Sequence, residues 1–473
     1  MMNLRPANQE FEKSLSSTLP DRIFKSVEPR YLEEPRARWA GQGGVLALPE
    51  TTQHVSVLVK AANEASIGIV PYGGGTGLVG GQIYPDGAAP LIISLEKMSR
   101  IREVYPSENV LVAEAGTILA NVQSAAKDVD RLFPLSLAAE GSARIGGNLA
   151  TNAGGINVLR YGNTRDLCIG LEAVLPDGSI WNGLSRLRKD NTGYDLRNLL
   201  IGSEGTLGII TAAALKLYPK PNTYGTAVFA VASPEAALEL LSLVRAEVGE
   251  AVSAFEIIHQ QGFNFLSEKL PNIRQPFATP PEWTVLVELG LGANVDGQAA
   301  LETIFATALE QGLLGDGLIA QSEGQRQEFW SVREHIPEAN RLIGSISSHD
   351  ISLPLSTVPE FITRANNVMN TIGAFRINCF GHLGDGNLHY NVFPMPGKTR
   401  QDHLEERDKV KLLLHDLVHE MGGSVSAEHG VGRLKVADLE RYADPVKLTT
   451  MRAIKAALDP KGIMNPGAVL RRV

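Results

Sequence analysis

The sequence is poor in cysteine: only Cys168 and Cys379 occur among its 473 residues. Two cysteines provide no disulfide framework, so we expect the chain to work in a reducing compartment. Long apolar runs are also missing, and no stretch approaches the roughly 20 apolar residues that a membrane helix needs. Residues 1–20 are polar and lack the apolar core of a secretory signal. These absences predict a cytoplasmic protein that is not transmembrane.

Positive charge is scarce as well. The 44 Lys and Arg residues are outnumbered by 52 Asp and Glu residues, which gives a net charge of −8, and no basic run suggests a groove for nucleic acid. The hydrophobic content of 44% and the charged content of 20% are typical of a globular protein. Because 473 residues exceed one ordinary core, we expect two or three domains.

Glycine, in contrast, is abundant, and many of the 47 glycines gather in clusters. The first cluster, residues 71–81, directly follows an apolar run at residues 67–71 that predicts a strand. Glycines after a strand allow backbone N–H groups to converge on an anion without obstruction by Cβ atoms. The spacing is neither the Rossmann fingerprint nor a Walker A loop. A cluster of surface turns would also explain this loop taken alone.

Three further segments are rich in glycine: residues 141–155, 161–166 and 202–211. Short β-like runs lie between them, at residues 110–113, 168–175 and 212–217, and Pro176-Asp177-Gly178 predicts a hairpin turn. Several separate backbone loops around one cofactor explain this spacing better than four unrelated turns.

Residues 71–81, 141–155 and 202–211 resemble, in the same order, the motifs of the FAD-binding domain of the vanillyl-alcohol oxidase (PCMH) type. The resemblance covers residues 49–219. It implies that FAD is bound non-covalently, because the first loop contains no His or Cys. It also implies two sets of contacts. Main-chain N–H groups hold the pyrophosphate at Gly73, Gly74, Gly75, Thr76 and Gly77, and the rest of the cofactor is lined by Gly141, Ser142, Gly147, Thr151, Gly154 and Ile210.

A second domain is expected after Pro219-Lys220-Pro221, where the pattern changes. Strand, helix and strand signals then follow one another twice, first over residues 226–258 and again over residues 283–321. This doubled unit predicts a ferredoxin-like sheet with helices on one face, so the chain as a whole is expected to be α+β. The predicted organisation is a lead-in at residues 1–48, the FAD-binding domain at 49–219, the ferredoxin-like substrate domain at 220–425, and a segment at 426–473 that returns to the FAD-binding domain.

A helix predicted to start at Ser322 contains the segment Trp330-Ser331-Val332-Arg333-Glu334. An Arg can bind a carboxylate through two parallel hydrogen bonds, although a lone helix Arg is usually exposed. The segment resembles the W-x-x-R-E helix of the C-terminal domain of FAD-linked oxidases, which implies that Arg333 holds the substrate carboxylate. Residues 350–354 match the same domain. Many relatives have a Lys two residues before Asp350, whereas this chain has Ser348, which weakens the expectation of a contact at the distal end of the substrate.

The densest set of candidate ligands lies near the C-terminus. Strand alternation over residues 388–393 places His389 and Asn391 on the face opposite to the apolar side chains, and a glycine-rich turn can bring His382 beside His389. Two imidazoles and a carboxylate form an open catalytic metal site, with Glu428 as the carboxylate. On an extended strand the adjacent His429 would point the other way and would be available as a base.

Other candidate ligands are interpreted as structural. Cys379 would lie on the face of its strand opposite to His382, so we expect it in the core. His415 and His419 have the i, i+4 spacing of a metal pair on a helix predicted at residues 404–421. No third ligand with a clear role accompanies them, and we expect both on the helix surface.

The motifs that contain His382, His389, Asn391, Glu428 and His429 resemble those of FAD-linked D-lactate and D-2-hydroxyglutarate dehydrogenases. The resemblance implies that the first two His and the Glu bind a divalent metal, usually zinc. It further implies that the Asn contacts the substrate and that the last His is the base. Asn465-Pro466-Gly467 resembles the closing segment of the family, which places Asn465 at the flavin.

The sequence therefore predicts a flavin-dependent dehydrogenase that oxidises a D-2-hydroxy acid to the 2-oxo acid with metal assistance. The electron acceptor could be an electron-transfer flavoprotein, a quinone or a cytochrome, and the chain could form a homodimer. The main alternative is a FAD-dependent oxidase of an alcohol, glycolate or sugar that uses oxygen. A regulatory module without turnover and a zinc hydrolase are further alternatives, and the hydrolase leaves residues 1–220 without a role.

Overall fold

The structure is a computed structural model that describes residues 3–472. The chain divides into two compact units. The first unit comprises the chain up to Gly155, the segment Gly162–Lys220 and the chain from Glu428 onward. The second comprises Ile156–Tyr161 and Pro221–Ala427. No described helix is long and apolar enough to cross a membrane.

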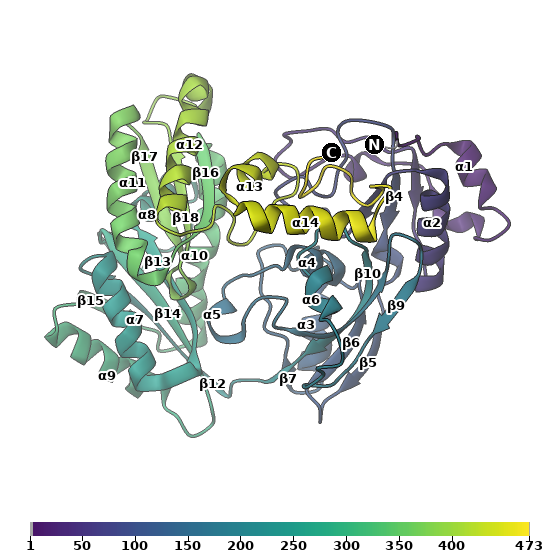
Figure 1. The fold of residues 1–473 in the computed structure, drawn as a ribbon. Coiled ribbons are helices and arrows are strands. Elements are labelled where there is room, and N and C mark those ends of the chain that lie inside the picture. Colours follow the sequence, from purple (N-terminus) through teal and green to yellow (C-terminus); the bar gives the residue numbers. More distant parts are fainter. Residues whose placement is uncertain (1–2, 473) are drawn as a thin grey trace. The chain divides into compact units, whose positions relative to one another are not determined.

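Two sheets form the framework of the first unit (Figure 1). In the smaller sheet the strand order is β1 (Phe24–Lys25), β2 (Val45–Ala47), β4 (Leu91–Ser94) and β3 (Ile69–Tyr72), and the last three are parallel. In the larger, antiparallel sheet the order is β5 (Ile101–Tyr105), β6 (Val110–Glu114), β10 (Ile209–Lys216), β8 (Cys168–Val174) and β9 (Ile180–Gly183). Strands β7 (Arg131–Leu132) and β11 (Tyr218–Pro219) form a separate pair.

Helices of the first unit are α1 (Gln9–Ser14), α2 (Thr52–Ala65), α3 (Leu119–Lys127), α4 (Ile145–Thr151), α6 (Leu196–Leu200), α13 (Val436–Tyr442) and α14 (Pro445–Leu458). Thr51 caps the start of α2, because its side chain accepts a hydrogen bond from the His54 N–H. The C-terminal segment joins this unit beside β3, because the N–H of Asn465 donates to the carbonyl of Ile69 at 2.8 Å. The Lys455 ammonium of α14 also donates to the carbonyl of Thr206 at 2.7 Å.

The N-terminal lead-in belongs to the first unit. The sequence predicted residues 1–48 only as a lead-in, and in the structure β1 pairs with β2 and places Phe24 opposite Ala47. Side chains scattered along this segment, Phe11, Leu15, Leu19, Ile23 and Tyr31, are buried. Phe11, Leu15, Leu19 and Ile23 recur every four residues, but the helix ends at Ser14, so this spacing alone does not show how the segment folds.

A seven-stranded antiparallel sheet forms the framework of the second unit. Its order is β15 (Leu314–Ile319), β12 (Thr223–Val231), β14 (Trp283–Leu291), β13 (Val252–His259), β17 (Arg376–His382), β18 (Asn387–Phe393) and β16 (Ser347–Ser352). The first four strands have the ferredoxin-like arrangement of a doubled strand–helix–strand unit. The last three strands extend that sheet, and β17 and β18 carry two of the candidate metal ligands, His382 and His389.

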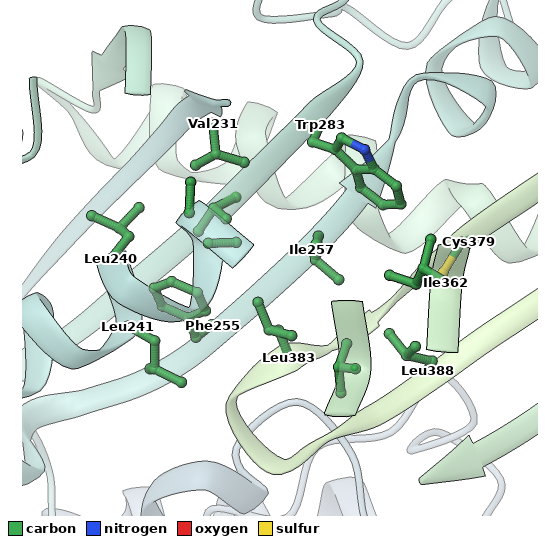
Figure 2. Close-up of a cluster of buried hydrophobic side chains, with 14 of the residues drawn as sticks. Val231, Leu240, Leu241, Phe255, Ile257, Trp283, Ile362, Cys379, Leu383 and Leu388 are labelled. Atoms are coloured by element: carbon green, nitrogen blue, oxygen red, sulfur yellow. The ribbon is translucent and has the colours of Figure 1, made fainter. Parts of the chain in front are cut away.

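Helices cover both faces of this sheet, whereas the sequence predicted helices on one. Packed against one face are α7 (Pro234–Val248), α9 (Gly297–Glu310), α11 (Val358–Ile372) and α12 (Leu404–Glu420). Figure 2 shows part of this core, where Leu240 and Leu241 of α7 lie near Phe255 and Ile257 of β13. Packed against the other face are α8 (Gln260–Lys269) and α10 (Glu323–Ile343).

The boundaries of the second unit follow from contacts within it. The short helix α5 (Val158–Tyr161) belongs to this unit although it lies inside the predicted FAD-binding domain. Its Arg160 guanidinium donates to the carbonyl of Gly290 at 2.6 Å and to the Ser253 hydroxyl at 3.2 Å. The unit ends at Ala427, two residues after the boundary that the sequence predicted.

Candidate active site

The first unit contains a cavity that several separate loops line. Its walls are the loop after β3, helix α4, the turn at residues 203–205, the start of β10, and Asn465. Nine of the predicted FAD contacts line it: Gly73, Gly74, Gly75, Thr76, Gly77, Gly147, Thr151, Ile210 and Asn465. Gly141, Ser142 and Gly154 are not among the lining residues.

Close backbone packing explains one of these glycines. A Cβ atom added to Gly74 would stand 2.3 Å from the carbonyl oxygen of Ser142, so a side chain cannot fit without a shift of the backbone. The backbone of Ser142 therefore packs directly against the glycine loop. No His or Cys occurs among the described residues that line the cavity, so the walls fit a cofactor held without a covalent bond.

Glu204 is a cavity residue that the sequence interpretation missed. Both of its carboxylate oxygens accept main-chain N–H groups, from Val431 at 2.7 Å and from Gly432 at 2.7 Å. Burial raises the pKa of Glu204 to about 7, against the opposing effect of those two N–H donors. Its contacts hold the segment that follows His429 against the cavity wall within the first unit.

The two candidate imidazoles lie on one face of the second unit's sheet. His382 ends β17, the turn at residues 383–385 follows, and Gly386 has a φ of +78° that favours glycine. His389 then lies in β18 opposite Phe380, and the rings of His382 and His389 are 5.7 Å apart. As strand alternation predicted, Leu388, Tyr390 and Val392 face the core instead.

A buried carboxylate on the neighbouring strand joins two of the predicted site residues. Glu256 Oε1 bonds His382 Nδ1 at 2.5 Å, and Glu256 Oε2 accepts from Arg333 Nε at 2.6 Å. Burial alone would raise the pKa of Glu256, but Arg333 and His382 outweigh it and lower that pKa to about 2. Sequence reasoning missed Glu256. The available signal was a single acid within the apolar strand at residues 252–258.

Three candidate ligands for a cation come together. His382, His389 and Glu428 each offer one ligand atom, and these atoms lie within 4.8 Å of one another. Glu428 follows Ala427, which is anchored to the sheet because its N–H donates to the carbonyl of Asp350 at 3.3 Å. Since Glu256 occupies Nδ1 of His382, Nε2 is the atom that a metal would take. Two imidazoles and one carboxylate fit a divalent metal with open positions.

The remaining predicted residues have different surroundings. Arg333 is buried beside the Phe380 ring rather than exposed on its helix. Asn391 is buried, and its Nδ2 donates to the carbonyl of His389 at 3.3 Å. Ser348, which stands where many relatives have Lys, lies opposite Asn391 in the sheet. His429 lies in a bend rather than on an extended strand, so strand alternation does not determine its direction.

Two interpretations of single residues have opposite outcomes. His415 was expected on the surface of its helix, which is wrong: it is buried against β16, with Nε2 3.2 Å from Nδ1 of His349. His349 alternates with Asp350 and therefore points to the face of the sheet opposite to the metal ligands. Cys379 is buried in the core as predicted, and burial raises its thiol pKa to about 12.

Comparisons with known proteins agree with this arrangement. Residues 220–469 match the family described as FAD linked oxidases, C-terminal domain, and residues 44–183 match the FAD binding domain family. The mitochondrial D-2-hydroxyglutarate dehydrogenase of Arabidopsis thaliana is 36% identical over 441 residues, which cover 92% of this chain and 76% of that protein. The D-2-hydroxyglutarate dehydrogenase of Xanthomonas citri pv. viticola is 35% identical over 459 residues, which cover 96% and 95%.

Among solved structures, p-cresol methylhydroxylase with substrate bound has a TM-score of 0.76 at 18% identity, and the alignment covers 99% of both chains. This likeness and the matched FAD binding domain confirm the predicted type of flavin domain. Several relatives are named as mitochondrial, so the cytoplasmic location stays a prediction. The chain belongs to the FAD-linked oxidases, in the family that includes the D-2-hydroxyglutarate dehydrogenases, and it is a flavin-dependent oxidoreductase.

Proposed function

We propose that the chain oxidises a D-2-hydroxy acid of the D-2-hydroxyglutarate type to the 2-oxo acid. The observation that carries the proposal is the pairing of a carboxylate-binding group with a cation site. Through Glu256, the buried Arg333 is joined to His382, which lies beside His389 and Glu428. An α-hydroxy carboxylate presents the two groups that such a pair would bind, an anionic carboxylate and a hydroxyl beside it.

Arg333 is the proposed clamp for the substrate carboxylate. Its Nε atom donates to Glu256, while its two terminal nitrogens donate to no other described residue and remain for a carboxylate. Asn391 lies on the same face of the sheet as His389 and is the proposed second contact to the substrate. Ser348, opposite Asn391, carries no charge, so a substrate with a distal carboxylate needs another cation for that group.

His382, His389 and Glu428 are the proposed ligands of a divalent metal, with zinc as the favoured ion. A bound metal would favour loss of the hydroxyl proton by stabilising the negative charge on that oxygen. His429 is the proposed base: it accepts the hydroxyl proton, and the electrons of the O–H bond form the new C=O bond. FAD held in the cavity of the first unit would supply the acceptor for the hydrogen on C2, which leaves with its electron pair.

Anaerobic reduction of FAD tests this function. The purified holoprotein is mixed with D-2-hydroxyglutarate, L-2-hydroxyglutarate and D-lactate, and flavin absorbance is recorded. We expect one equivalent of D-2-hydroxyglutarate to bleach the flavin and its enantiomer to leave it oxidised. Bleaching by neither D-acid would contradict the proposal. Rapid peroxide formation when oxygen is admitted would instead favour the oxidase alternative.

The electron acceptor and the oligomeric state stay predictions. An electron-transfer flavoprotein, a quinone and a cytochrome are the candidate acceptors, and a homodimer is the candidate assembly. Each candidate acceptor can be added to the reduced holoprotein, because only a competent acceptor restores flavin absorbance without oxygen. The oligomeric state can be measured on the same holoprotein.

Gly147→Ala is expected to weaken FAD binding without weakening the fold. An added Cβ there meets no protein atom within 4 Å, although Gly147 lines the cavity, so the methyl group enters the space proposed for FAD. We expect roughly 5–150-fold weaker FAD binding, from an overpacking cost of about 1–3 kcal/mol. Because Gly147 lies within α4, Ala also favours the helix by about 1 kcal/mol.

Fluorescence titration of the apoprotein with FAD measures this change, and thermal unfolding of the apoprotein checks the fold. Gly324→Ala is the matched control, because Gly324 also lies in a helix, α10, is exposed and does not line the cavity. Unchanged FAD affinity in Gly147→Ala would place the cofactor elsewhere.

A further inference from the structure

Glu256 is a fully buried carboxylate whose two oxygens contact two different site residues. It lies on β13, on the face that carries Ala254 and Ile258 and that packs against α10. Resting on the proposed function, we infer that Glu256 is a positioning residue. It fixes the ring of the metal ligand His382 and the guanidinium plane of the substrate clamp Arg333 at the same time.

The effect on His382 is a choice of tautomer. A carboxylate at Nδ1 accepts a hydrogen bond from the N–H of that nitrogen, so the other nitrogen, Nε2, keeps its lone pair for a metal. The 2.5 Å contact also stops the ring from turning about its bond to Cβ. Because the exposed fraction of Glu256 is 0%, water cannot replace either interaction at this carboxylate.

The effect on Arg333 is orientation of the guanidinium plane. Glu256 accepts from Nε at 2.6 Å, and the guanidinium carbon lies 4.8 Å from the centre of the Phe380 ring. These two contacts fix the plane from its edge and from its face, while the two terminal nitrogens are not consumed. A guanidinium held in this way can receive a carboxylate with little further loss of side-chain freedom.

A second Arg–Glu pair, between the half-buried Arg326 of α10 and the buried Glu288 of the same sheet, shows what a purely structural pair looks like. Glu288 on β14 accepts from Arg326 at Nε, at 2.7 Å, and at Nη2, at 3.0 Å. The third nitrogen of Arg326, Nη1, donates to Glu323 at 2.9 Å. All three nitrogens of Arg326 are therefore satisfied within the unit, whereas Arg333, two turns further along α10, gives only Nε to its carboxylate. This contrast favours a binding role for Arg333 and a positioning role for Glu256.

Glu256→Gln separates positioning from packing, with Glu288→Gln as the matched control. The Gln amide has nearly the shape of the carboxylate but only one oxygen, so its NH₂ group must face either His382 or Arg333. Facing His382, the NH₂ donates to Nδ1 and moves the ring proton to Nε2, the atom proposed as ligand. We expect about 10–100-fold weaker metal binding in Glu256→Gln, the usual effect of losing such a partner of a metal-bound His.

Metal affinity is measured by competition of the FAD-loaded protein with a chromophoric zinc chelator. A rise in KM for D-2-hydroxyglutarate beyond the change in kcat reports the loss of Arg333 orientation. Glu288→Gln is expected to lose comparable stability in urea unfolding but to keep the metal affinity and KM of the parent. Equal metal affinity in Glu256→Gln and the parent would overturn the inference, even if activity fell.

The parent protein distinguishes this inference from the proposed function. If the parent binds zinc and oxidises D-2-hydroxyglutarate while Glu256→Gln retains full metal affinity, only the positioning role fails. If the parent oxidises no 2-hydroxy acid but Glu256→Gln loses metal, the positioning role stands and the proposed function fails. If the parent binds no divalent metal, both the metal site and the positioning role are wrong.

Discussion

Replacing His429 with Asn is expected to slow the reduction of FAD by substrate by about 10²–10⁴-fold, the usual contribution of a general base. Asn keeps a polar side chain of similar length but cannot accept a proton at neutral pH. The N–H groups of Val431 and Gly432 hold the following segment to Glu204, and the substitution leaves these bonds in place. The loss should therefore appear in the chemical step and not in substrate affinity.

Anaerobic stopped-flow mixing measures this step directly, because flavin absorbance falls only when hydride is transferred. His419→Asn is the control, since His419 is an exposed histidine on α12. Flavin bleaching in His429→Asn as fast as in the parent would remove His429 from the base role.

Sequence patterns predicted the glycine loop and the two faces of β18, because neighbouring residues determine both. The glycine loop that follows β3 could be recognised because a strand, a turn and the absence of side chains lie next to one another in the chain. The division of β18 into a core face and a site face follows from alternation alone, so His389 and Asn391 could be placed together. The ferredoxin-like strand order likewise follows from a repeated unit of neighbouring elements.

Pairings between distant residues could not be predicted in this way. Glu256 and His382 are 126 residues apart, and Glu204 and Gly432 are 228 residues apart. A single acid in an apolar strand shows that a partner must exist, because a buried charge without one is too costly, but it does not show which residue that partner is. Sequence reasoning predicted His382 and Arg333 as site residues but not Glu256, the residue that contacts both.

The outcome for His415 illustrates the same limit on a helix. Its spacing from His419 shows which residues share a side of α12 but not which side faces a sheet. The structure packs His415 against β16, next to His349, while His419 stays exposed. Only the arrangement of α12 on the sheet separates the two, and that arrangement is set by Val410, Leu414, Leu417 and Val418 of the core.

The second large effect is expected from loss of a proposed metal ligand. His389→Ala removes one of three donors that lie within 4.8 Å of one another. It should weaken metal binding by more than the roughly 10–100-fold expected when a residue that only contacts a metal ligand is changed. Asp350 should not compensate, because its oxygen is 4.0 Å from His389 Nδ1 and already accepts from Asn387 at 3.0 Å.

Elemental analysis of the purified holoprotein gives the metal content, and turnover after exhaustive chelation gives its role. We expect His389→Ala to contain little metal, to keep its FAD, and to lose turnover that added zinc restores only at high concentration. His419→Ala should match the parent in all three measurements. It would lose metal only if the metal were bound by His415 and His419 of α12 instead. Since the FAD cavity lies in the first unit and His389 in the second, retained FAD with lost turnover would separate the two proposed roles. Full turnover by a parent protein that contains no metal would contradict the metal site and leave Arg333 and His429 to account for the chemistry without it.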